Sequence, residues 1–111
     1  MQATIRLTNE INEETINIFD VKDRNMLVYQ DGDGADCRIA IFEDGLVIER
    51  NSSDHRTLLD LRQPCRAVIS SDLGELEFEM KRLEFSINDG NIVVAYTVND
   101  VKTVMEICFR W

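Results

Sequence analysis

The chain alternates apolar and polar residues over most of its length, and the alternation is clearest toward the C-terminus. Residues 75–80 alternate three glutamates with three large apolar residues. Because successive side chains of a β-strand point to opposite faces of the sheet, this pattern predicts a strand with one wet face and one packed face. Residues 83–87 continue the alternation in the opposite parity, which predicts a bulge or corner across Lys81-Arg82.

Two turn signals divide the C-terminal third into three strands that pair in sequence order. Residues 88–91 and Asn99-Asp100 both combine residue types that tolerate left-handed backbone. With 88–91 as a loop, the predicted pairs are Ile87–Ile92, Phe85–Val94 and Leu83–Tyr96. With Asn99-Asp100 as a two-residue turn, they are Val98–Val101, Tyr96–Thr103, Val94–Met105 and Ile92–Ile107. A one-residue slip would bring Lys102 or Glu106 into this apolar set, so the pattern specifies the register.

A third hairpin is predicted around Glu43-Asp44-Gly45, where glycine supplies a positive φ. A two-residue turn at Asp44-Gly45 pairs Ile41 with Ile48. The face that this register turns inward carries Cys37, Ile39, Ile41, Leu46 and Ile48. By parity Arg50 lies on the same face.

The rest of the chain is predicted to form short strands. They cover residues 4–8, 15–19, 26–29, 57–61 and 66–70, with a turn over 71–74 before the glutamate-rich strand. A helix over 12–22 is the competing interpretation of the N-terminal region, but β-branched residues and the lack of a 3.6-residue apolar face argue against it. The count of eight to ten strands predicts an all-β fold, as a sandwich or a single small antiparallel, mostly up-and-down barrel.

The segment from residue 36 onward resembles the YwiB-like family. The resemblance rests on the RIAIFEDGLVIER hairpin, the LGELEFEMKRLEF strand, the NDGNIVVAYTV hairpin partner and a final alternating strand. That bacterial family has a calycin-like β-barrel fold related in architecture to the lipocalins, and no established function. The resemblance therefore implies a calycin-like barrel and supplies no catalytic residues.

The composition narrows the classes of partner. The 111 residues, with a mass of 12.8 kDa, fit a single domain over 1–111. The net charge of −9 repels phosphate backbones and anionic lipid surfaces, so neither nucleic acid nor a membrane is an expected partner. The three cysteines form no CxxC pair, and no apolar leader or membrane span is visible. A cytoplasmic protein with reduced thiols is expected, and the oligomeric state stays open.

Three residues are candidates for ligand binding. Arg50 and Tyr96 are predicted to point inward among apolar neighbours, where Arg50 needs a carboxylate, carbonyl groups, an anionic ligand or water at the strand end. His55, the single histidine, is expected to be exposed and is a candidate acid or base. The loop Asp31–Asp36 fails the calcium-loop spacing and is predicted to be solvated. No catalytic residue, cofactor or metal is predicted.

These features favour a non-enzymatic barrel that binds a small apolar or amphipathic ligand, including an anionic one, in its mouth. The alternative is a packed barrel that acts as a protein-interaction or structural module. Its contact surface would be an exposed strand edge or the outward apolar residues Phe42, Val47, Val93 and Val104. An enzyme is the third choice.

Overall fold

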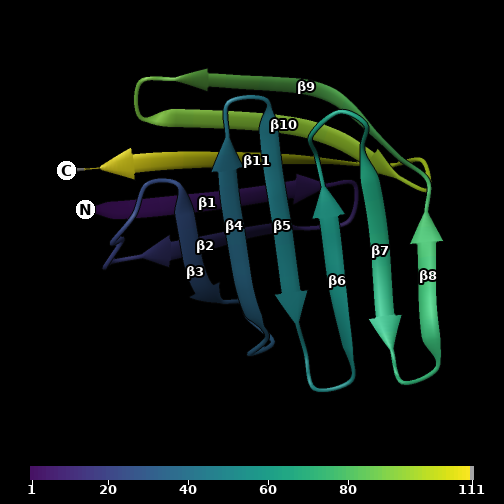
Figure 1. Cartoon of the computed structure of the whole chain (residues 1–111). Helices are drawn as coiled ribbons and strands as arrows, with labels where there is room; N and C mark the ends of the chain where they lie inside the picture. Colours follow the sequence, from purple (N-terminus) through teal and green to yellow (C-terminus); the bar gives the residue numbers. More distant parts are fainter. Residues whose placement is uncertain (111) are drawn as a thin grey trace. The chain divides into compact units, whose positions relative to one another are not determined.

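The computed structural model describes residues 1–110 and contains eleven β-strands (Figure 1). They are β1 (Gln2–Asn9), β2 (Glu13–Ile18), β3 (Met26–Gln30), β4 (Asp36–Phe42), β5 (Gly45–Asn51), β6 (His55–Asp60), β7 (Arg66–Ser71), β8 (Gly74–Phe78), β9 (Met80–Asn88), β10 (Asn91–Val98) and β11 (Val101–Arg110). No helix is present in this range, so the all-β prediction is confirmed. The helix considered for residues 12–22 is replaced by β2.

The strands form two antiparallel sheets, and each belongs to a separate compact unit of the chain. The five-stranded sheet has the order β2-β1-β11-β10-β9, and the six-stranded sheet runs from β3 to β8 in sequence order. Hairpins connect successive strands within each sheet, as the up-and-down prediction expects. Among residues 1–110 no strand of one sheet pairs with the other sheet, so the predicted single closed barrel is not found. Alternation determines faces and hairpins, but it does not mark where a sheet ends.

The hairpin of β10 and β11 has the predicted register throughout. Val98 pairs with Val101, and Ile92 pairs with Ile107. Asn99 and Asp100 form the turn with φ values of 49° and 67°, as a type I′ turn requires. The chain ends meet in the same sheet, because β1 pairs with β11 along its whole length.

The hairpin of β9 and β10 follows the prediction at two of its three pairs. Ile87 faces Ile92 and Phe85 faces Val94, but Tyr96 lies opposite Arg82 and not Leu83. A bulge interrupts the register there, so the predicted Leu83–Tyr96 pair was wrong and the Leu83 side chain is 54% exposed. The bulge lies close to the parity change that predicted it across residues 81–82.

Buried apolar side chains of the five-stranded sheet line up across neighbouring strands. Ile5, Ile107 and Ile92 form one such row, and Met105 with Val94 forms part of the next. All five side chains are buried. Burial of a large aliphatic side chain contributes roughly 1.5–3 kcal/mol, so these rows stabilise the sheet.

The hairpin of β4 and β5 differs from the prediction by two residues. Gly45 lies opposite Phe42, and Ile41 pairs with Leu46 where Ile48 was expected. The turn is therefore Glu43-Asp44. The reason is packing, because a Cβ on Gly45 would lie 2.6 Å from the main-chain oxygen of Leu61. A shift of two residues preserves parity, so the predicted inward face, Arg50 included, is unchanged.

Candidate functional site

The turn between β3 and β4 is organised by the carboxylate of Asp31. Its Oδ1 accepts hydrogen bonds from the main-chain N–H groups of Asp33 and Ala35 at 3.0 and 3.1 Å. The N–H of Gly34 donates to the main-chain oxygen of Asp31 at 3.0 Å. Aspartate commonly closes turns in this way, since its short side chain reaches main-chain donors two to four residues ahead. The sequence prediction of a solvated loop did not include this role.

Arg50 lies at the end of β5, opposite Cys37 on β4, and is paired with this turn. Its Nε donates to Oδ2 of Asp31 at 2.5 Å, and its Nη2 lies 3.5 Å from Oδ2 of Asp33. The side chain of Asp31 is 12% exposed and that of Arg50 is 31% exposed. Of the partners that the sequence allowed for Arg50, the structure supplies a carboxylate.

The ionisation of these groups reflects the pairing. Burial raises the pKa of Asp31, but the hydrogen bonds from Arg50, Ala35 and Asp33 outweigh it and hold that pKa below its ordinary value. The same hydrogen bond raises the pKa of Arg50. Burial, and then the charge of Asp31, raise the pKa of the Cys37 thiol, which makes it a poor nucleophile.

His55 begins β6 and is half-buried, less exposed than the sequence suggested. Its Nδ1 lies 3.1 Å from Oγ of Ser52, and its main-chain N–H donates to the same oxygen at 3.3 Å. These contacts fix the β5–β6 turn.

Arg50 and His55 line one open hollow of about 570 Å³ at this end of the six-stranded sheet. The hollow is bounded by Asp33, Gly34, Ala35, Asp36, Arg50, Asn51, Ser52, Ser53, Asp54 and His55. Two turns distant in sequence, β3–β4 and β5–β6, and the strand ends beside them supply these residues. The structure thus brings two of the three predicted site residues together.

Tyr96, the third predicted site residue, lies on β10 in the five-stranded sheet. Its side chain is buried and hydrogen-bonded to Thr103, its cross-strand neighbour on β11. Burial raises the pKa of Tyr96 to about 12. The hydroxyl group therefore has a partner within its own sheet.

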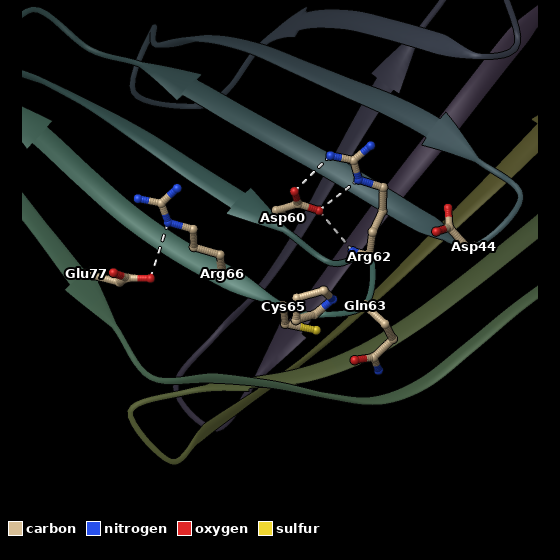
Figure 2. A pocket seen from close by; sticks show the side chains of 8 residues that line it. Asp44, Asp60, Arg62, Gln63, Cys65, Arg66 and Glu77 are labelled. Atoms are coloured by element: carbon tan, nitrogen blue, oxygen red, sulfur yellow. Dashed lines mark hydrogen bonds and ion pairs between the residues drawn. The ribbon is translucent and has the colours of Figure 1, made fainter.

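A second hollow, of about 490 Å³, was not predicted from the sequence (Figure 2). It lies where β6 leads into β7, and four of its charged side chains form two ion pairs. Arg62 binds Asp60 through two hydrogen bonds of 3.0 and 2.9 Å, and Nε of Arg66 lies 3.2 Å from Glu77. Cys65 sits in the connecting loop. The Asp60-Leu61-Arg62 spacing, which places both charges on one side of an extended chain, was the available sequence signal.

The described part of the chain holds no cluster of three or more His, Cys, Asp or Glu residues placed to bind a metal. In the aspartate-rich loop, Asp31 is engaged by Arg50 and by main-chain N–H groups. Cys37, Cys65 and Cys108 form no disulfide. Within residues 1–110 no helix has the length and apolar character of a membrane span.

Comparison with known proteins gives one informative match. Neither a family model nor a curated protein matches the chain. The crystal structure of the ywiB protein from Bacillus subtilis superposes with a TM-score of 0.58 and 17% sequence identity, covering 96% of this chain and 85% of that one. The likeness extends over nearly the whole chain, beyond the segment that suggested it. The chain therefore has a YwiB-like fold.

Proposed function

We propose that this chain is a non-enzymatic binding protein that holds a small molecule in the hollow beside Arg50 and His55. One observation carries the proposal: two residues singled out separately from the sequence line the same hollow of about 570 Å³. That volume lies within the range of small-molecule sites, about 300 to 1,000 Å³. Polar groups of Asn51, Ser52 and Ser53 also line it.

The lining indicates the class of ligand. The lining contains three carboxylates, those of Asp33, Asp36 and Asp54, and one guanidinium, that of Arg50. Arg50 is already neutralised by Asp31, so an anion gains little there. The lining also contains no large apolar side chain. The proposed ligand is therefore polar and either uncharged or cationic, in place of the apolar or amphipathic anion expected from the sequence.

We also propose the barrel and the cellular location that the sequence predicts. The family resemblance supports a calycin-like barrel from a bacterium, and the three cysteines, which form no disulfide, support a location in the cytoplasm. Tyr96 is left out of the proposed site, because its side chain is already hydrogen-bonded to Thr103 in the five-stranded sheet. An experimental structure would test the barrel, since closure requires strands of the two sheets to pair.

The ligand proposal is tested in two steps. Native mass spectrometry of freshly purified protein, compared with its denatured mass, detects a co-purified molecule. Three probes with the same eight-carbon tail, octylamine, octyl glucoside and octanoate, are then added below micellar concentration while amide NMR signals are followed. We expect shifts at residues 51–55 with the amine and the glucoside and weak shifts with octanoate. Equal shifts with all three probes would favour the amphipathic ligand expected from the sequence. The absence of both a shift and an excess mass would refute the site.

The second candidate function is a protein-interaction module, favoured by open sheet edges and exposed apolar residues. Of the four outward apolar residues expected to form its surface, Phe42 is 41% exposed. Val47, Val93 and Val104 are half-buried. These four are a weaker surface than a strand edge, where main-chain groups also lack partners.

A further inference from the structure

Strand β8 is an open edge of the six-stranded sheet (Figure 1). It pairs with β7 on one side in a regular register, and no other strand within residues 1–110 pairs with it. Residues 74–77 are exposed on both faces, and the Leu76 side chain is 65% exposed. An edge strand presents a row of main-chain N–H and C=O groups without a strand partner, which is a template for another extended chain.

Each of the other three edge strands differs from β8 in the exposure of its faces or in the regularity of its ladder. In β2 and β3 exposed residues alternate with buried or half-buried ones, so one face is covered. In β9 the bulge opposite Ala95 and Tyr96 interrupts the ladder, a device that hinders edge-to-edge pairing. β8 alone among them combines a regular ladder with exposure of both faces along most of its length.

The side chains of β8 indicate which chain fits. Glu75 and Glu77 lie on one face, and Leu76 lies on the other. A second copy paired antiparallel about Leu76 would place Glu75 against Glu77, and like charges directly opposite are destabilising. Glu77 contacts Arg66 at 3.2 Å, but the two side chains are 63% and 56% exposed, so this face stays open to a further cation.

We infer that β8 binds an extended basic segment of another protein, which adds to the sheet as a further strand. Two lysines or arginines at alternate positions face Glu75 and Glu77, and the apolar residue between them covers Leu76. The net charge of −9 draws a basic segment toward the protein. This interaction does not involve the hollow beside Arg50, so it stands or fails separately from the proposed ligand site.

Fluorescence anisotropy with a labelled nine-residue peptide that alternates lysine and valine tests the inference. A second peptide has the same composition with its lysines grouped at one end. The protein variant is Glu75→Gln with Glu77→Gln. Its matched control is Glu10→Gln with Glu43→Gln, two exposed turn residues, because both variants change the net charge from −9 to −7.

We expect the alternating peptide to bind, and we expect added salt to weaken this binding. The β8 variant should lose about fivefold in affinity, and the control variant less than about twofold. Binding should also slow amide hydrogen exchange at residues 75–77. Equal losses of affinity in both variants, or equal affinity for the two peptides, would contradict the inference. The binding would then be unspecific electrostatic attraction. No binding at about 1 mM peptide would contradict the inference and would mean that the two glutamates only prevent this edge from pairing with other strands. A wild-type dimer with protected β8 amides would also contradict it, because a second copy of the chain would then occupy the edge.

Discussion

The guanidinium of Arg50 is bound to the carboxylate of Asp31, nineteen residues earlier in the chain. Because the same carboxylate accepts N–H groups of Asp33 and Ala35, it ties the end of β5 to the turn between β3 and β4. Arg50 is thus part of the framework of the hollow. Its charge is balanced within the protein before any ligand arrives.

Replacing Arg50 by methionine should destabilise the fold. Arg50→Met leaves the carboxylate of Asp31, which is 12% exposed, without its cation, and we expect the free energy of unfolding to fall by about 1–2 kcal/mol. Urea denaturation measures the change. The control is Arg56→Met, whose pair with Glu49 joins a 55% exposed side chain to a partly exposed one and should contribute less than about 0.5 kcal/mol. Equal losses would contradict the framework role of Arg50.

Tyr96 should make the protein sensitive to alkali. Burial raises its pKa to about 12, whereas the ordinary value is 10.0. Above pH 10 the unfolded chain releases a proton that the folded chain retains. The stabilising contribution is therefore complete below pH 10 and is lost as the pH rises toward 12. Urea denaturation across this range should show a steeper loss for the wild type than for Tyr96→Phe. Parallel curves would show that Tyr96 is not the group responsible.

A charge in the centre of β10 should abolish folding of the five-stranded sheet. Val94 is 0% exposed and pairs with Phe85 and Met105 on either side. Val94→Asp buries an unpaired carboxylate, and we expect a cost above about 4 kcal/mol, seen as loss of a cooperative thermal transition in circular dichroism. The neighbouring Val93→Asp lies on the opposite face, opposite Glu106, and should cost about 1 kcal/mol. A tolerated Val94→Asp would refute the observed register.

Gly45 should tolerate no side chain. Gly45→Ala places a Cβ 2.6 Å from the oxygen of Leu61, and the N–H of Leu61 is itself hydrogen-bonded to Leu46 at 2.8 Å. Because both contacts involve main chain, relief requires the strands to shift, at a cost of about 2–4 kcal/mol. Gly34→Ala meets open space and is penalised only by its φ of +82°, about 1 kcal/mol. Thermal melts of both variants measure the two losses of stability. An equal or larger loss for Gly34→Ala would contradict the prediction.

The turn between β10 and β11 can be improved. Asp100 has a φ of 67°, and glycine adopts such a conformation without the steric cost that a side chain carries. Asp100→Gly should therefore raise the free energy of unfolding by about 0.5–1 kcal/mol in urea denaturation. Asp72→Gly is the control, because Asp72 lies in a turn without a positive φ and should gain nothing. A gain in stability for Asp72→Gly but not for Asp100→Gly would contradict this prediction.

Much of the candidate site could be predicted from parity and little of it from chemistry. The sequence placed Arg50 on the face of Cys37 and Ile39, and an error of two residues in the predicted register left that placement intact. Its partner Asp31 was out of reach, because pairing across nineteen residues depends on how two turns meet. The second hollow was missed for the same reason, since Glu77 joins Arg66 from a neighbouring strand.

Alternation and the turn signals together determined most strands, their faces and the register of the β10–β11 hairpin, because a slip of one residue would have turned charged side chains into the apolar row. The tertiary structure decided where each sheet ends, where the β9–β10 bulge falls and which carboxylate meets Arg50. These features depend on contacts between segments distant in sequence. A local two-residue period places the bulge only approximately, through the parity change at residues 81–82. It does not determine the sheet ends or the partner of Arg50, because many arrangements of the same strands preserve it.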